Sequence, residues 1–122
     1  MVKFETAVLR GYETYMTDKE TTISVLAEYC GQDKEYVEAI MYGLKDTYKN
    51  AMIISIDPNK NKVVDFYEIM KANGDIDADT PHKMEDHVNT SIYEDALKIM
   101  IERGSNKDIF THLMDEFKIN NF

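Results

Sequence analysis

The stretch from Ser55 to Gly74 constrains this chain most, because its residues fit two structures with different functions. In the first interpretation, Asp57 caps a helix, Pro58 occupies its first turn and Asn73-Gly74 ends it. Asp is a favoured N-cap, Pro is tolerated in a first turn, and Gly adopts the left-handed conformation that closes a helix. The apolar side chains of the stretch recur at helical spacing and would form one packed face: Val63, Phe66, Tyr67 and Met70.

In the second interpretation, the same stretch is a calcium-binding loop. Oxygen-bearing side chains occupy the first, third, fifth, ninth and twelfth positions of such a loop: Asp57, Asn59, Asn61, Asp65 and Glu68. An EF-hand loop supplies ligands from these positions and ends on a bidentate Glu. The sixth position, where the sharp turn needs Gly, holds Lys62, and Lys60 adds positive charge near the ion. The capped helix is therefore favoured, no metal is expected, and the calcium loop is kept as an alternative.

The composition is that of one folded, acidic domain. The chain has 122 residues, of which 43% are hydrophobic and 30% charged, with a net charge of −9. We expect a single helical domain over 1–122 with a modest core. An acidic surface is repelled by nucleic acids and by anionic membranes, so neither is expected as a partner. No apolar run approaches the roughly 20 residues that cross a bilayer, and the N-terminal residues do not resemble a signal peptide.

Apolar residues at helical spacing predict an all-α fold of about six or seven short helices, arranged as an orthogonal bundle without an internal repeat. The first helix is expected over about residues 3–16. The second, opened by a Thr17–Glu20 capping box, stops near Gly31, and the third, capped by Asp33, ends near Gly43. The side chains expected to face inward from these helices are Phe4, Val8, Leu9, Tyr12, Met16, Ile23, Leu26, Tyr29, Val37, Ile40, Met41 and Leu44.

Residues 46–56 are compatible with a short strand or a buried connector, because periodicity cannot separate the two over so few residues. After the helix over 57–72, a polar surface loop is expected, with a short helical turn starting at Thr80-Pro81. A second capping box, Ser91–Glu94, opens a helix that closes at Gly104, and a last helix follows. Their expected inward side chains are Ile92, Ala96, Leu97, Ile99, Met100, Ile109, Phe110, Leu113, Met114 and Phe117.

No group of residues forms an evident active site. Cys30, the single cysteine, excludes an internal disulfide and a cysteine zinc cluster, and we expect a buried, inert thiol. His82 and His87 are five residues apart, which is not one face of a helix, so with His112 they are expected on the surface rather than as metal ligands or general bases. The chain has no Gly-rich phosphate loop and no nucleophile motif, so we expect neither an enzyme nor a cofactor.

Several segments, taken in order, resemble a known family. They are Glu5-Thr-Ala-Val-Leu-Arg-Gly-Tyr, Thr17-Asp-Lys-Glu, Val25-Leu-Ala-Glu-Tyr-Cys-Gly, Tyr36-Val-Glu-Ala-Ile, Phe66-Tyr-Glu-Ile-Met-Lys-Ala-Asn-Gly-Asp-Ile and His87-Val-Asn-Thr-Ser-Ile-Tyr-Glu-Asp-Ala-Leu. These segments are similar to the C-terminal part of ABC-transporter substrate-binding proteins of the nitrate, sulfonate, taurine and thiamine-precursor type. The similarity covers about residues 5–100.

The resemblance implies the helical tail of a two-lobed α/β protein that delivers a small solute to an ABC permease and its ATPase. No solute-contacting residue is carried over, because the chain corresponds only to the helical end of such a protein. An extracytoplasmic location is implied if the chain is part of a full binding protein, and a cytoplasmic one is expected if it is complete. Helices that normally rest on a sheet would expose apolar faces, so we also expect self-association, as a dimer. The alternatives are the calcium-binding helix–loop–helix at 57–68 and an acidic helical protein-interaction domain.

Overall fold

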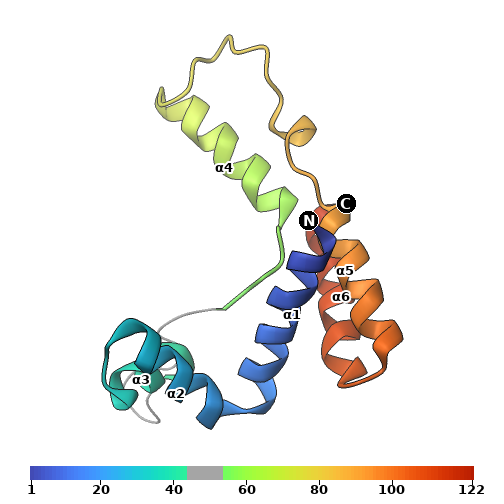
Figure 1. Cartoon of the computed structure of the whole chain (residues 1–122). Coiled ribbons are helices and arrows are strands. Elements are labelled where there is room, and N and C mark those ends of the chain that lie inside the picture. Colours follow the sequence, from blue (N-terminus) through green and yellow to red (C-terminus); the bar gives the residue numbers. More distant parts are fainter. Residues whose placement is uncertain (44–53) are drawn as a thin grey trace. The chain divides into compact units, whose positions relative to one another are not determined.

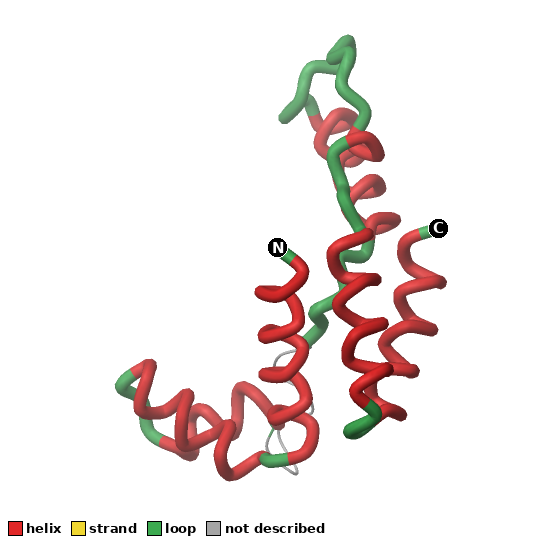
Figure 2. Tube along the Cα trace, turned by 45° about the vertical axis from the view of Figure 1, so that its right-hand side comes forward, coloured by secondary structure: helices red, strands yellow, loops and turns green. Residues whose placement is uncertain are grey.

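A computed structural model describes residues 1–43 and 54–122 (Figure 1). Its elements are α1 (Val2–Thr17), α2 (Lys19–Cys30), α3 (Lys34–Tyr42), α4 (Lys60–Asn73), the 3₁₀ helix η1 (Met84–Asp86), α5 (Ser91–Arg103) and α6 (Lys107–Asn121). Figure 2 shows only helices and loops over these described ranges, with no strand. The predicted all-α class with six or seven helices is confirmed. The question of a strand at 46–56 lies mostly outside the described residues, and Ile54–Ile56 have no regular structure.

The chain divides into two compact units. One consists of Met1–Leu9 with Asp57–Phe122, and the other of Arg10–Ile56. In the first unit, α5 and α6 lie side by side (Figures 1 and 2). Their facing side chains are buried and form most of this unit's core: Tyr93, Ala96, Leu97, Met100, Phe110, Leu113 and Phe117. Because fully burying one large apolar side chain contributes about 1.5–3 kcal/mol, this helix pair supplies the main apolar stabilisation of the unit.

The sequence predicts the C-terminal end of α5 correctly, but not the residues that cap its N-terminal end. Gly104, with a φ of 78°, ends the helix in the left-handed conformation, as predicted. The Ser91–Glu94 capping box is wrong, because Ser91 is already helical and its N–H and hydroxyl both donate to Asn89 Oδ1, at 3.0 and 2.8 Å. Glu94 instead pairs with Lys98 one turn later, at 2.7 Å. Asn89, which precedes the helix, therefore fixes the position of its first residue.

The cap of helix α4 lies two residues later than the predicted Asp57. Its N-cap is Asn59, in a left-handed conformation with a φ of 47°, and the side chain of Asn59 accepts from the Lys62 N–H at 3.2 Å. The predicted helix end is confirmed: Gly74 has a φ of 82° and donates to the Lys71 carbonyl. The predicted packed face is wrong for Val63 and Phe66, which are 37% and 62% exposed, whereas Tyr67 is buried and Met70 is partly buried.

The segment between α4 and α5 is the surface loop that the sequence predicts, but its helical turn lies elsewhere. The turn η1 forms at Met84–Asp86 rather than at Thr80-Pro81. Tyr67 of α4 holds this loop, since its hydroxyl donates to the His82 carbonyl at 3.0 Å. The loop is thus attached to α4 through the one buried side chain of that helix.

In the second unit, α2 and α3 pack on each other around Ile23, Ala27 and Val37. The C-terminal part of α1 is tied to α3 by a pair of stacked tyrosines, Tyr15 and Tyr42, whose ring centroids are 4.8 Å apart. The Tyr15 hydroxyl donates to the Met41 carbonyl at 3.0 Å, and the Tyr42 hydroxyl donates to the Tyr15 carbonyl at 2.8 Å. Burial raises the pKa of the Tyr15 hydroxyl, and the neighbouring Tyr42 raises it further.

The cap of α2 is Asp18 rather than the predicted Thr17. The Asp18 carboxylate accepts from the N–H and the hydroxyl of Thr21, at 3.0 and 2.7 Å, and these hydrogen bonds lower its pKa. Thr17 ends α1, where its hydroxyl donates to the Glu13 carbonyl. Asp33 does stand at the N-cap of α3, without a side-chain capping bond, and Gly43 follows its last residue as predicted.

The expectation of a buried Cys30 is wrong, since this thiol is exposed. The buried residues of α2 are Ile23 and Ala27, and residues 28–36 are all exposed, so the last turn of the helix extends past the packed part of the unit. Tyr29, also expected to face inward, is 87% exposed for the same reason. Other residues predicted to face inward are likewise exposed, namely Phe4, Met16 and Ile99.

Candidate functional site

Asp57 lies at the centre of a polar cluster that joins the start of α4 to the end of α6. Its Oδ2 accepts from the Asn120 side-chain amide at 2.6 Å, and its Oδ1 accepts from the Asn121 side-chain amide at 2.8 Å. The side-chain amide oxygen of Asn121 (Oδ1) in turn accepts from the backbone N–H of Lys60, the first residue of α4, at 2.8 Å. We call this group of Asp57, Lys60, Asn120 and Asn121 the Asp57 clasp.

The Asp57 clasp satisfies groups that would otherwise be costly to bury. Asn121 is only 4% exposed and donates a further hydrogen bond to the Phe117 carbonyl at 2.9 Å. A first-turn N–H of a helix has no partner within the helix, and here Asn121 supplies one to Lys60. Hydrogen bonds to a charged group contribute about 1.5–3 kcal/mol each. The clasp therefore fixes where α4 begins and holds that end on α6.

The five candidate calcium ligands are not brought together as a loop. Both oxygens of Asp57 bind Asn side chains, and Asn59 caps α4. The remaining three lie exposed along α4: Asn61, Asp65 and Glu68. A calcium loop must wrap its ligands around the ion, which a regular helix from Lys60 onward does not allow. Within 1–43 and 54–122, no group of three or more His, Cys, Asp or Glu is placed to hold a metal. The calcium hypothesis stays a prediction, and this geometry speaks against it.

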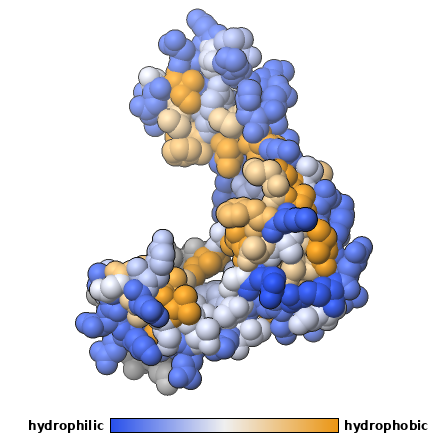
Figure 3. All heavy atoms as spheres, in the orientation of Figure 1, coloured by the Kyte–Doolittle hydropathy of each residue, from blue (hydrophilic) through white to orange (hydrophobic). Residues whose placement is uncertain are grey.

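Helix α4 of the first unit carries an exposed apolar face. Val63, Phe66 and Ile69 follow one another at intervals of three residues and are 37%, 62% and 54% exposed. Figure 3 shows apolar side chains gathered along the visible face of this helix. We call these three residues the α4 apolar face. Single exposed apolar residues are common, whereas a contiguous group on one helix indicates a contact surface.

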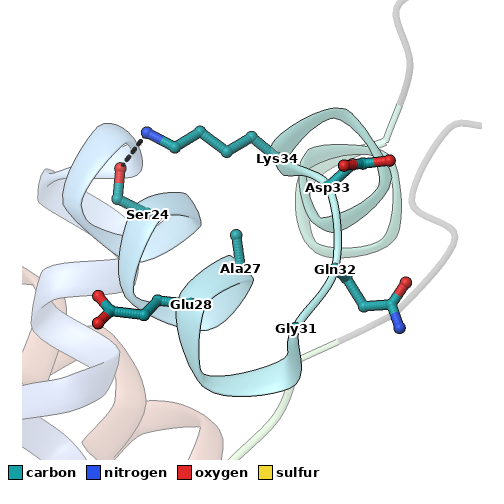
Figure 4. Close-up of a pocket in the computed structure, with 7 residues that line it drawn as sticks. All are labelled: Ser24, Ala27, Glu28, Gly31, Gln32, Asp33 and Lys34. Atoms are coloured by element: carbon teal, nitrogen blue, oxygen red, sulfur yellow. Dashed lines mark hydrogen bonds between the residues drawn. The ribbon is translucent and has the colours of Figure 1, made fainter.

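The second unit has an open hollow of about 500 Å³ between the end of α2 and the start of α3 (Figure 4). Lys34 Nζ donates to Ser24 Oγ at 2.9 Å along one edge. Figure 4 shows Ala27 toward the middle of the hollow, whereas Glu28 and Gln32 point away from it. A ligand site normally has a few polar groups that converge on one point. The polar side chains here diverge, so we assign this hollow no ligand.

The three histidines are exposed, as the sequence predicts. The rings of His82 and His87 nevertheless lie close to each other, with centroids 5.9 Å apart. His112 lies on α6, with its Nε2 3.4 Å from the Glu116 carboxylate.

Two residues of the Asp57 clasp, Asn120 and Asn121, were not predicted from the sequence. Their partner Asp57 lies 63 and 64 positions away, so no local pattern links them. The only signal is indirect: two adjacent Asn residues are poor helix formers at the end of an otherwise amphipathic helix.

Comparison of the chain with models of protein families, with curated proteins and with solved structures finds no match in any of the three. The resemblance to ABC-type binding proteins therefore rests on the segments quoted above. Across the described parts of the chain, none of the helices combines the length and the apolar character required to cross a membrane.

Proposed function

We propose that this chain is a non-enzymatic component of small-solute transport, equivalent to the helical C-terminal part of an ABC-type solute-binding protein of the nitrate and sulfonate type. Its role is to dock, through the α4 apolar face, on the α/β lobes that hold the solute. The solute itself would bind to those lobes and not to this chain. The location would then be extracytoplasmic, with the ABC permease and its ATPase as further partners.

The α4 apolar face is the observation that carries this proposal. Full burial of a large apolar side chain contributes about 1.5–3 kcal/mol, and Phe66 and Ile69, which are 62% and 54% exposed, would gain roughly half of that on docking. The Asp57 clasp holds one end of α4 on α6, and Tyr67 attaches the other side of the helix to the following loop. The helix is therefore anchored while its apolar face stays available. A tail helix that lies on a neighbouring lobe needs both properties.

A second candidate function is favoured by the charge of the chain. The net charge of −9 combined with the α4 apolar face suits an acidic interaction domain that binds a basic protein and takes no part in transport. The two candidate functions use the same surface and differ in the partner. An experiment must therefore measure whether a change in the α4 apolar face alters solute transport.

The test is solute uptake by cells of the source organism in which the chromosomal gene carries Phe66→Glu. We expect uptake of at least one of nitrate, taurine, an alkanesulfonate or a thiamine precursor to fall about tenfold or more, because a buried unpaired carboxylate weakens docking by several kcal/mol. Val25→Glu is the matched control: Val25 is an apolar residue on α2 that is 58% exposed, and its change should leave uptake unaltered.

The outcomes separate the two candidates. Unchanged uptake of all four solutes in the Phe66→Glu strain contradicts the transport proposal. If that strain instead loses binding to a basic partner protein while uptake is normal, the interaction domain is the better account. Equal loss of uptake with Val25→Glu would show that the α4 apolar face has no special role.

A further inference from the structure

His82 and His87 form an imidazole pair on the loop between α4 and α5. Their ring centroids are 5.9 Å apart with an interplanar angle of 64°, and both side chains are exposed. The proposed transport function does not use this pair. Its chemistry is specific, because a neutral imidazole nitrogen is the commonest protein ligand for transition metals.

The backbone holds both histidines in place while their side chains can turn. The His82 carbonyl accepts from the hydroxyl of the buried Tyr67, at 3.0 Å. The N–H of His87 donates to the Met84 carbonyl at 2.9 Å, which closes the turn η1 between the two histidines. The pair is thus presented by a fixed piece of chain, and bringing two ring nitrogens to one point requires only rotation of exposed side chains.

The spacing of the rings suits a shared ion. Zinc–imidazole bonds are about 2 Å long, so two rings bound to one ion have centroids about 5–6 Å apart. Glu85 and Asp86, both exposed, lie within η1 between the histidines and add negative charge near the pair. Negative charge raises the local concentration of cations, and the remaining coordination positions are left to water.

We propose that His82 and His87 together bind one divalent transition-metal ion of the kind that prefers nitrogen ligands, such as Zn²⁺, Ni²⁺ or Cu²⁺. The two imidazoles are the protein ligands, and waters complete the coordination sphere. Such a site has open positions and exchanges its ion readily. Hard cations that prefer oxygen ligands, such as Ca²⁺ and Mg²⁺, do not bind to it.

The test is calorimetric titration of the full chain with Zn²⁺ and Ni²⁺, in a Cys30→Ser background so that the exposed thiol does not contribute. We expect one ion per chain, and either His82→Gln or His87→Gln should weaken the affinity about tenfold or more. His112→Gln is the matched control, since His112 is exposed on α6 and should leave the affinity unchanged. In the NMR spectrum, paramagnetic Ni²⁺ should broaden the signals of residues 82–87 before those around His112.

Absence of Zn²⁺ and Ni²⁺ binding would overturn the proposal. So would an affinity that His82→Gln and His87→Gln leave unchanged, or one that His112→Gln lowers as much. The same variants are also titrated with Ca²⁺. If Ca²⁺ binds, and if this binding survives both histidine substitutions but is lost in Glu68→Ala, the metal site lies in the 57–68 stretch instead.

Discussion

The carboxylate of Asp57 accepts a hydrogen bond of 2.8 Å from the side-chain amide of Asn121, which lies 64 positions further along the chain. The same amide group of Asn121 caps the first N–H of α4 through its oxygen. The start of α4 is therefore set by the last turn of α6 and not by the Asp57-Pro58 pair alone. Through this contact, the C-terminal helix holds the helix that carries the α4 apolar face.

Removing the Asn121 side chain should loosen this connection. We expect Asn121→Ala to lower the free energy of unfolding by about 1–3 kcal/mol, because Asp57 and the Lys60 N–H lose a buried partner. Urea denaturation followed by circular dichroism measures the change. Asn73→Ala, at an exposed position in the last turn of α4, is the control and should change the free energy by less than about 0.5 kcal/mol. Equal effects of the two substitutions would show that the clasp contributes nothing.

The cap of α2 should depend on pH through Asp18. Hydrogen bonds from the Thr21 hydroxyl and N–H lower its folded-state pKa below the ordinary value of an Asp carboxyl. A depressed carboxyl pKa gives stability that is present above the unfolded value and is lost as the pH falls through the folded value. The protection of the Thr21 amide from hydrogen exchange, measured relative to the intrinsic exchange rate at each pH, should therefore fall in acid. In Asp18→Asn, whose side-chain oxygen caps without titrating, this loss of protection should be absent. If it persists, another group causes the effect.

The Cys30 thiol should react with a disulfide reagent in the folded protein. Exposed thiols are accessible to attack, whereas buried ones must wait for unfolding. We expect one thiol per chain to be labelled, at a rate within about tenfold of that measured in denaturing urea. Much slower labelling of the folded protein would mean that the end of α2 is covered.

The isolated chain should self-associate through the α4 apolar face when no other partner is present. Sedimentation velocity at increasing concentration should show a dimer, because association covers Phe66 and Ile69. Phe66→Glu should shift the chain towards the monomer, and Val25→Glu should not. A monomer at every concentration, or equal effects of both variants, would count against self-association through α4.

The fold class was predictable because most helices carry their own local signals. Leu97 and Met100 of α5 are three residues apart, and Phe110 belongs to a similar apolar series on α6. Gly31, Gly74 and Gly104 end helices in the left-handed conformation, which Gly adopts without steric cost. Caps were less predictable. At α2 and α5 the sequence offers adjacent polar residues that could each cap, and which of them does so depends on a hydrogen bond to a residue two or three positions away.

The candidate site was harder to predict from the sequence than the fold class. Periodicity identifies the apolar side of a helix but not whether another element covers it, and so Phe66 was expected to be buried although it is 62% exposed. Cys30 was wrongly expected to be buried, because apolar neighbours in the sequence do not show whether the end of a helix is covered. The Asp57–Asn121 contact joins residues that no short pattern connects, and the nearness of His82 and His87 depends on the turn between them. Such relationships arise only when the chain is folded.

The central claim, that α4 docks on a solute-binding protein, is tested most directly by photo-crosslinking in living cells. A photoreactive phenylalanine analogue at position 66 replaces an exposed aromatic residue by a similar one, and the same analogue at position 25 on α2 is the control. We predict that position 66 captures a two-lobed solute-binding protein or its permease, identified by mass spectrometry, and that position 25 does not. The account would be contradicted if position 66 captured only proteins unrelated to transport. It would also be contradicted if position 25 captured the same transport proteins equally well.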